Sequence, residues 1–450
     1  MNNLKKSVAM LIGMLTLASS AFALNDHILV GYWHNFKNGA ANGMKLSQCP
    51  TYWDVINLSF GEPTSPTDGN IVYNPTADNI YSSAAEFQAD VQLVQSRGQK
   101  VLLSIGGANG QVRLETESAR NTFITQVENI CRTYGLDGLD VDFEGNSMSF
   151  NEGDCDLANP TTPVIKNLIY ALRKICNDMG DDFLLTFAPE TFFVQQGYSY
   201  YGTTCWGCDK RAGSFLPVLY ALRDRLDWLQ VQYYNSGVIP SPQNPGGESC
   251  GTEDFVVNLA KMLMNGFPIA NQNGSLCGPT SFPALRQDQV VLGVPSVTGS
   301  AGAGVLTTDQ YKSIANKLRA AGYGNMRGFM TWSVNWDEQY SRQWSAPMAA
   351  YIADWNGNPD PINNGGNEGG NEGGNEGCNE GGNEGGNEGG QSGDCSAYEQ
   401  YNSAQAYNVY GEHAGVQFAY NGNVYTITPG NWVPAGCTPD GAYSYLWTLV

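Results

Sequence analysis

Residues 136–144, LDGLDVDFE, are the stretch from which the fold of this chain can be predicted. Side chains alternate between the faces of a β-strand, so Asp140, Asp142 and Glu144 share one face and the apolar residues between them share the other. Three ionised acids about 6 to 7 Å apart repel one another, and at least one should keep a proton near neutral pH, as a general acid must. A solvated strand or a cation site is the alternative, but the wholly apolar opposite face favours a buried strand whose acids do chemistry.

Short runs of β-branched and aromatic residues alternate with amphipathic helical patterns between residues 24 and 357. The runs expected to form strands are 28–33, 55–60, 100–105, 138–143, 183–188, 228–233, 290–294 and 328–332. Eight strands, each followed by a helix, predict an α/β fold, a closed (β/α)8 TIM barrel. An open doubly wound sheet is the alternative, but no G-x-G-x-x-G motif follows the first run. Catalytic groups of such barrels lie at the C-terminal ends of strands, which is where Glu144 falls.

Three helix boundaries can also be predicted. One apolar stripe is followed by Gly135, a typical residue just after a helix. A second helix should begin at residues 162–163, where Pro takes the first helical position, and end before Gly180. Residues 307–310, TTDQ, have the pattern of a capping box and predict the start of a third helix.

The two ends of the chain differ in composition from residues 24–357. Residues 1–23 contain two lysines, an apolar run and a small-x-small triplet, which predict a signal peptide and a secreted, extracellular protein. The apolar run is too short for a membrane anchor. From residue 364 to residue 390 the chain repeats Gly-Gly-Asn-Glu, which predicts that residues 358–394 are a flexible linker.

Residues 395–450 return to a composition typical of folded domains and are rich in aromatic residues. Alternating patterns on both sides of an Asn-Gly pair at residues 416–427 predict a β-hairpin. We therefore expect a small all-β module with a binding function, in which a disulfide between Cys395 and Cys437 would help a marginal core.

Eleven cysteines fit an oxidising destination, but their pairing cannot be read from the sequence. Residues 205–208, CWGC, have the spacing of a redox motif, yet a small structural loop is favoured in an exported chain. Cys250 and Cys277 bracket a long segment and are a plausible pair. Cys131 and Cys176 lie on the inward stripes of predicted helices, where they could pair or remain buried thiols.

Charge and histidine content limit the partners. The formal net charge of −20 at pH 7 argues against nucleic acid or an anionic membrane. His27, His34 and His413 do not have the spacing of zinc ligands, so no metal or other cofactor is expected. The abundance of Tyr and Trp suits stacking against sugar rings, and nothing in the sequence requires more than a monomer.

Residues 137–144 match the D-x-x-D-x-D-x-E pattern, and the chain thereby resembles glycoside hydrolase family 18, the chitinases. Further motifs of that family recur in the right order at the expected strand ends. They are SIGG at 104–107, APE at 188–190, QYYN at 232–235 and Trp332. The QYYN version is similar to the branch that includes plant hevamine-type and some bacterial chitinases, such as the chitinase D-like enzymes.

The resemblance implies a retaining, substrate-assisted hydrolysis of chitin, in which the 2-acetamido oxygen of the substrate attacks the anomeric carbon. Glu144 would be the general acid and then the base. Asp142 would orient the acetamido group, and Asp140 would share a proton with Asp142. Tyr234 would hydrogen-bond the acetamido carbonyl, and Trp332 would form an apolar floor beneath the sugar.

The resemblance also implies a cleft for N-acetylglucosamine oligosaccharides. Its further substrate-binding residues would be Tyr32, Phe60, Gly107, Ala188, Glu190, Gln232 and Asn235. Asp137 falls on the opposite face of its strand and should have a structural role. Where many relatives have Asp, Asn235 cannot ionise, so the pH profile should differ. The short connection between the last two predicted strands leaves no room for an insertion domain, which implies an open groove and endo-type cleavage.

The C-terminal segment resembles the small chitin-binding modules of carbohydrate-binding families 5 and 12 over residues 410–425. The resemblance implies chitin binding through aromatic residues, with Trp432, Trp447 and Tyr425 as the candidates. Two alternatives to a chitinase share the barrel. An endo-β-N-acetylglucosaminidase acting on glycoprotein glycans would have the same acids, whereas a chitin lectin would lack the acid that Glu144 supplies.

Overall fold

The computed structural model describes residues 24–202, 204–271 and 275–357, together with the backbone of six short strands between residues 399 and 449. Contacts divide the chain into two units, Met1–Gly366 and Asn367–Val450. The predicted signal peptide at 1–23 and the predicted linker at 358–394 lie outside the described residues. Both assignments therefore stay predictions.

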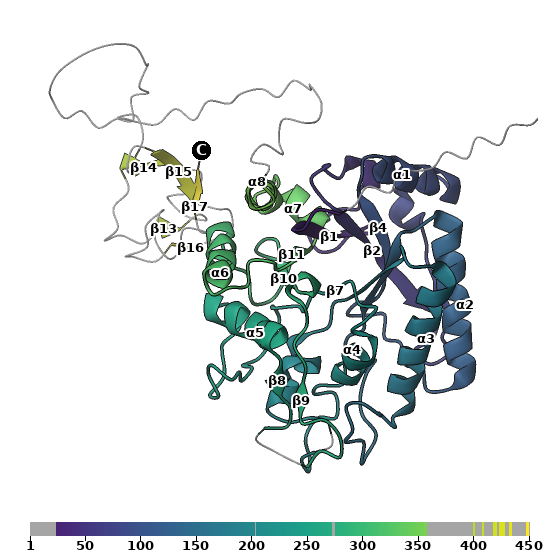
Figure 1. Ribbon diagram of the computed structural model, residues 1–450. Helices are drawn as coiled ribbons and strands as arrows, with labels where there is room; N and C mark the ends of the chain where they lie inside the picture. Colours follow the sequence, from purple (N-terminus) through teal and green to yellow (C-terminus); the bar gives the residue numbers. More distant parts are fainter. Residues whose placement is uncertain are drawn as a thin grey trace, which may run out of the picture. The chain divides into compact units, whose positions relative to one another are not determined.

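Parallel strands form the centre of the first unit (Figure 1). These strands are β1 (Ile28–His34), β2 (Val55–Pro63), β4 (Lys100–Gly106), β5 (Gly138–Asp142), β6 (Leu184–Phe187), β7 (Trp228–Leu229), β10 (Val291–Pro295) and β11 (Gly328–Trp332). Their order in the sheet is β10-β11-β1-β2-β4-β5-β6-β7. Parallel bridges from Leu229 to Val290 and from Gln232 to Gly293 join the two ends of this sheet, so it curls into a barrel. The (β/α)8 prediction is confirmed, and the open-sheet alternative is wrong.

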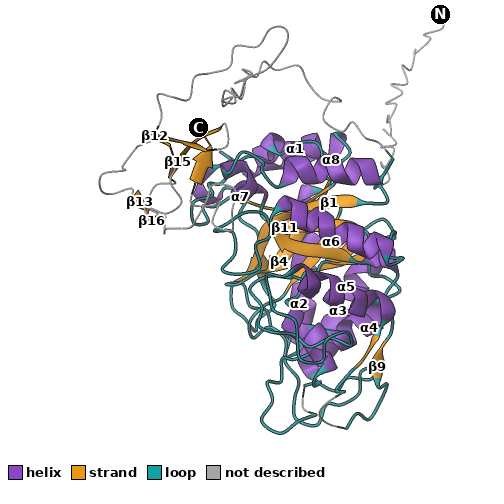
Figure 2. Cartoon of the chain, turned by 90° about the vertical axis from the view of Figure 1, so that its left-hand side faces the viewer, coloured by secondary structure: helices purple, strands orange, loops and turns teal. Residues whose placement is uncertain are grey.

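Helices surround these strands, and loops gather beside them (Figure 2). The helices are α1 (Ala84–Ser96), α2 (Glu117–Tyr134), α3 (Pro163–Met179), α4 (Leu216–Leu222), α5 (Glu253–Asn265), α6 (Thr308–Ala320), α7 (Val334–Gln339) and α8 (Ser345–Trp355). All three predicted boundaries are confirmed. Gly135 follows α2 with a φ of 68°, a left-handed value that glycine adopts at little cost. Pro163 is the first residue of α3, and Thr307 forms a capping box with Gln310 at the start of α6.

Shorter elements complete the first unit. They are β3 (Ile71–Val72), β8 (Phe267–Pro268), β9 (Ser281–Phe282) and the 3₁₀ helices Leu46–Gln48, Ala77–Asn79, Thr191–Phe193, Gln195–Tyr198 and Gln287–Gln289. Strand β3 pairs with β2, and β8 pairs with β9, in both cases antiparallel. Between β10 and β11 the chain forms α6 and no separate domain, as the short connection predicted.

The strands separate two apolar layers. On β1, Ile28, Val30 and Tyr32 pack in a cluster formed by side chains of the strands, inside the barrel. Leu29 and Trp33, which alternate with them, pack in the larger cluster with residues of the helices. The alternation on β5 is the same, because its apolar residues face the helices while the acids face the barrel interior.

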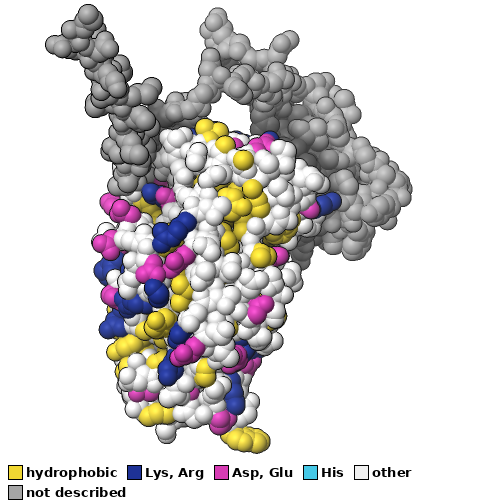
Figure 3. Space-filling model, turned by 90° about the vertical axis from the view of Figure 1, so that its right-hand side faces the viewer, with side chains coloured by type: hydrophobic (Ala, Val, Ile, Leu, Met, Phe, Trp, Pro, Cys, Tyr) yellow, Lys and Arg dark blue, Asp and Glu magenta, His cyan; other side chains and the backbone are white. Residues whose placement is uncertain are grey.

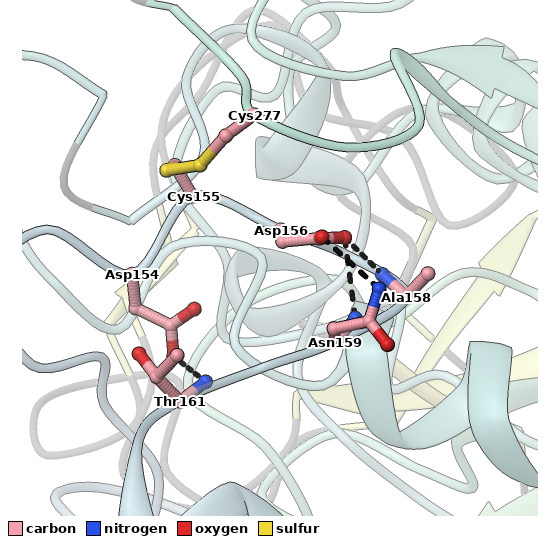
Figure 4. The surroundings of a disulfide bond; sticks show 7 residues. All are labelled: Asp154, Cys155, Asp156, Ala158, Asn159, Thr161 and Cys277. Carbon is pink, nitrogen blue, oxygen red and sulfur yellow. Dashed lines mark hydrogen bonds between the residues drawn. A yellow bond between two sulfur atoms is a disulfide. The ribbon is translucent and has the colours of Figure 1, made fainter.

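Two disulfides are present among the described residues. Cys155 pairs with Cys277 across 122 residues and joins the loop after β5 to the segment before β10 (Figure 4). The predicted pair of Cys250 with Cys277 is therefore wrong, and Cys250 is a free thiol. The sequence could not give this pairing, because it depends on which loops the barrel brings together. Asp156, next to Cys155, accepts hydrogen bonds from the backbone nitrogens of Ala158 and Asn159 (2.9 and 3.2 Å), which folds this loop on itself.

The second disulfide joins Cys205 and Cys208 and confirms the predicted small loop. Cys131 and Cys176, whose pairing the sequence left open, are buried free thiols. Figure 3 shows basic and acidic side chains interspersed over the face on which α2 and α3 lie. Ion pairs within these helices, such as Lys174–Asp178, account for part of this mixture.

The C-terminal strands are β12 (Glu399–Gln400), β13 (Tyr407–Asn408), β14 (Gln417–Tyr420), β15 (Asn423–Ile427), β16 (Trp432–Val433) and β17 (Trp447–Leu449). Strands β14 and β15 pair antiparallel with Tyr420 opposite Asn423, as the hairpin prediction requires. The side chains of this unit lie outside the described residues. The binding module, its aromatic contacts and the pair of Cys395 with Cys437 therefore stay predictions.

In the part of the chain that the structure describes, no helix combines the length and the apolar character that crossing a bilayer requires.

Candidate active site

The C-terminal ends of the barrel strands open into a cleft of about 520 Å³. Most of the site residues predicted from the sequence line it. They are Tyr32, Phe60, Gly107, Asp142, Glu144, Glu190, Gln232, Tyr234, Asn235 and Trp332. The cleft also has lining residues that the sequence reasoning missed, among them Phe36, Lys37, Asn38, Glu62 and Ser300. Phe36, Lys37, Asn38 and Ser300 come from loops, where no periodic pattern marks a position that faces the cleft, whereas Glu62 belongs to β2.

Asp140 lies beneath the cleft, fully buried inside the barrel. Its Oδ2 accepts hydrogen bonds from the hydroxyls of Tyr32 (2.5 Å) and Ser104 (2.7 Å). Its Oδ1 accepts from the hydroxyl of Thr186 (2.6 Å) and from Nε2 of Gln230 (2.9 Å). Burial raises the pKa of Asp140, and these four hydrogen bonds oppose the rise. Four donors occupy the acceptor sites of one carboxylate, which stabilises its ionised form.

Asp142 and Glu144 are joined by one amide group. Nε2 of Gln232 donates to Oδ1 of Asp142 (2.8 Å) and to Oε1 of Glu144 (2.9 Å). Burial and then the charges of Glu144 and Asp140 raise the pKa of Asp142 well above its ordinary value. Burial also raises the pKa of Glu144, whereas its hydrogen bonds with Gln232 and Asp142 lower that pKa. In this conformation Gln232 therefore links Asp142 to Glu144. That Asp142 shares a proton with Asp140 stays a prediction.

The same amide nitrogen of Gln232 also donates to the backbone oxygen of Ala188 (2.9 Å). Ala188 is fully buried and does not line the cleft, although the sequence predicted it as a substrate-binding residue. It acts on the site by holding Gln232. Glu190, two residues further on, does line the cleft. Burial, followed by the charge of Glu144, raises the pKa of Glu190, whereas Arg211 lowers it.

Three aromatic side chains of the cleft pack against one another. The rings of Phe60 and Trp332 are stacked, with centroids 5.8 Å apart and planes at 8°, and the ring of Tyr32 lies 5.9 Å from that of Trp332. Burial and then Asp142 and the neighbouring acids raise the pKa of Tyr234 well above its ordinary value. The hydroxyl of Tyr234 therefore keeps its proton and can donate a hydrogen bond.

Glycines at the end of β4 allow the backbone to approach these groups. Gly106 and Gly107 have φ values of 121° and 71°, which residues other than glycine rarely adopt. A Cβ atom at Gly106 would lie 2.0 Å from the backbone oxygen of Asp142, and one at Gly107 would lie 2.7 Å from the ring of Phe60. The glycine pair thus keeps the cleft open between β2 and β5.

Asn235 is exposed at the rim of the cleft, with a φ of 49°. Its Oδ1 accepts hydrogen bonds from the backbone nitrogens of Gly302 (2.8 Å) and Ala303 (3.1 Å). Asn235 therefore fastens the loop after β10, and only its amide nitrogen remains for the predicted contact with a substrate.

Asp137 has the structural role that the alternation predicted. One of its oxygens accepts hydrogen bonds from the backbone nitrogen of Val101 (2.9 Å) and from Nε2 of Gln95 (2.7 Å). The other forms an ion pair with Nζ of Lys100 at 3.2 Å. These contacts tie the start of β5 to β4 and α1.

Thr186 and Gln230 were missed by the sequence reasoning, although both bind Asp140. The signal was present, because each lies two residues before a residue already assigned to the site, and such residues share a face of a strand. Among the described residues no group of three or more His, Cys, Asp or Glu side chains is arranged to hold a metal ion.

Comparison with known proteins identifies the family. Residues 28–245 match the family described as glycosyl hydrolases family 18. A probable class II chitinase of Arthroderma benhamiae is 46% identical over 305 residues, which cover 64% of this chain and 89% of the relative. The chain belongs to glycoside hydrolase family 18.

Other relatives of this family 18 protein are longer. Exochitinase 1 of Streptomyces olivaceoviridis is 47% identical over 327 residues, which are 69% of this chain but only 53% of that relative. The chain thus spans about half the length of that protein. The crystal structure of a family GH18 chitinase from Chromobacterium violaceum superposes with a TM-score of 0.64 at 36% identity, covering 73% of this chain and 83% of that one.

The hydrogen bonds at Asp140 can be tested with Thr186→Val, which removes a donor but keeps the shape of the side chain. We expect the free energy of unfolding to fall by about 1 to 3 kcal/mol, because a buried charged group loses a hydrogen bond. Urea unfolding measures the change. Thr125→Val, an exposed threonine of α2, is the matched control and should change stability by less than about 0.5 kcal/mol. Equal stabilities of the two variants would contradict the role of Thr186.

Proposed function

We propose that this family 18 protein is a secreted chitinase that hydrolyses β-1,4 bonds between N-acetylglucosamine units with retention at the anomeric carbon. The observation that carries the proposal is the pair of carboxyl groups joined by Gln232 in a cleft that Tyr234 and Trp332 also line. The names of the relatives, which include chitinases of bacteria and fungi, support the substrate.

Cleavage needs one acid from the protein. Glu144, whose pKa is raised by burial, donates its proton to the glycosidic oxygen as the bond to the anomeric carbon breaks. The acetamido oxygen of the same sugar attacks that carbon and forms an oxazolinium intermediate. Glu144, now a carboxylate, takes a proton from water as the water oxygen attacks the same carbon. The ring of the intermediate opens, and Glu144 is again protonated.

The neighbours of Glu144 position the acetamido group. Asp142, close to Glu144, accepts the acetamido N–H and stabilises the positive charge of the intermediate. Tyr234 keeps its proton and donates to the acetamido oxygen. Trp332, stacked on Phe60, offers an apolar face to the sugar ring. Asp140 acts as a positioning residue through the electrostatic field that it exerts on Asp142.

An inverting mechanism is not favoured by this geometry. Inverting glycosidases keep their two carboxyl groups about 6.5 to 9.5 Å apart to leave room for a water molecule. Here a single nitrogen of Gln232 lies within 3 Å of an oxygen of both Asp142 and Glu144. The presence of Glu144 in the cleft also argues against a chitin lectin, and the names of the relatives do not favour a glycoprotein endoglycosidase.

The remaining parts of the proposal concern how the polymer is reached. The connection between β10 and β11 adds no wall to the cleft, which supports an open groove and endo-type cleavage. The C-terminal segment would bind chitin through Trp432, Trp447 and Tyr425. A signal peptide at residues 1–23 would direct export, and the enzyme would act as a monomer without a cofactor.

Replacement of the acid is the first test. Glu144→Gln should lower the rate of hydrolysis of colloidal chitin by about 10² to 10⁴, since the amide cannot protonate the leaving oxygen, while chitin binding persists. Glu117→Gln, which replaces an exposed side chain of α2, is the matched control. Chromatography of early products also tests endo-type action, because nearly pure disaccharide from the first time points would contradict it. Residual activity of Glu144→Gln close to wild type would contradict the assignment of the acid.

The pH profile tests the amide that joins the acids. The hydrogen bond from Gln232 stabilises ionised Glu144 and lowers its pKa, so Gln232→Met should raise that pKa. Because the general acid must be protonated, the basic limb of the kcat/KM profile should move to higher pH by about one unit. Gln343→Met, an exposed control, should leave the limb in place. A limb that stays fixed or moves to lower pH in Gln232→Met would refute this role.

A further inference from the structure

Trp206 is the most exposed large hydrophobic residue in the described part of the chain. Its exposed fraction is 102%, whereas the next value, that of Val238, is 56%. A tryptophan side chain can bury 150 to 250 Å² of surface, so leaving the whole indole in water forgoes a large stabilisation. An exposed aromatic residue of this size is typical of a binding surface.

The loop that carries Trp206 is closed and fastened at its base. The disulfide between Cys205 and Cys208 encloses Trp206 and Gly207. Just beyond the loop, the backbone oxygen of Lys210 accepts a hydrogen bond from the nitrogen of Phe150 (2.9 Å). Nζ of Lys210 also forms an ion pair with Glu152 at 2.6 Å. The backbone that carries Trp206 is therefore restricted before any ligand binds, which lowers the entropic cost of ordering the loop on binding.

The segment after this loop lines a second hollow, of about 350 Å³. Asp209 and Arg211 contribute polar groups to it, and the exposed Val238 contributes an apolar one. Glu190 and Asn235 line both this hollow and the catalytic cleft. The two hollows therefore adjoin at these two residues.

Arg211 connects this hollow to the catalytic strand. Its Nη1 donates to the backbone oxygen of Gly145 (3.3 Å), the residue after Glu144, and its guanidinium pairs with Asp209 at 2.6 Å. Trp206 is three residues from Asp209, so their Cα atoms are at most about 11 Å apart. Trp206 therefore lies near the second hollow, which Trp332 does not line.

We propose that Trp206 is a binding residue for a distal part of the polysaccharide chain whose bond is cut at Glu144. The indole stacks on the apolar C–H face of a sugar ring. The polar groups of the second hollow face the hydroxyls of the sugars between Trp206 and Glu144. This inference rests on the proposed function. It commits to a polysaccharide because the hollow near Trp206 adjoins the cleft that holds the acids.

The test compares a short and a long soluble substrate, the trimer of N-acetylglucosamine and glycol chitin, with the full chain. Trp206→Ala should lower kcat/KM on glycol chitin roughly tenfold, about 1.4 kcal/mol of binding, through KM. On the trimer, which offers at most two sugars on one side of the cleaved bond, the variant should equal wild type. Trp206→Tyr, which keeps an aromatic face, should restore most of the loss. Tyr170→Ala removes a half-exposed aromatic residue of α3 that lines neither hollow, and it should change neither substrate.

Other outcomes would overturn the inference. Equal values for Trp206→Ala and wild type on glycol chitin would show that the indole binds no sugar. An equal loss on both substrates would show a structural effect on the cleft, and an equal loss in Tyr170→Ala would show a general effect of the surface. If the wild type cuts the trimer but Trp206→Ala equals it on glycol chitin, only this inference is contradicted. A wild type that cuts neither substrate contradicts the proposed function as well.

Discussion

The buried carboxylate of Asp140 is the constraint on which the rest of the site depends. A charge inside a barrel is costly unless donors replace its water, and Asp140 has four of them. Tyr32 comes from β1, Ser104 from β4 and Thr186 from β6, and Gln230 directly follows β7. Because these donors belong to separate strands, the charge is satisfied only when the strands curl into the barrel, which couples the fold to the chemistry.

The charge beneath the cleft sets the properties of the acids above it. Burial, and then the charges of Glu144 and Asp140, raise the pKa of Asp142 well above its ordinary value, so ionisation of one acid in the row opposes ionisation of the next. Gln232 holds Asp142 and Glu144 side by side, and burial raises the pKa of both carboxyl groups. In the proposed mechanism one carboxyl group acts as the acid while its neighbour orients the substrate. This division of roles explains why a row of like charges can be useful in a water-poor interior.

Periodicity predicted much of this arrangement, because a strand fixes the direction of every second side chain. The faces of β5, the caps of α2 and α6 and the opposite placement of Asp137 all follow from local geometry. The partner of Cys277 and the loop residues of the cleft could not be predicted, since they depend on how distant loops meet. Asn235 is an intermediate case, because the sequence assigned it to substrate binding but could not predict its hydrogen bonds to the following loop.

The central claim is that Glu144 is the only acid from the protein that the reaction needs and that the acetamido group of the substrate replaces a second one. The anomeric form of the first product tests this claim directly. Proton NMR during hydrolysis of N-acetylglucosamine oligomers should show the β-anomer first, followed by slow conversion to the equilibrium mixture, because two displacements at one carbon retain its configuration. Initial release of the α-anomer would mean a single displacement by water and would contradict the account.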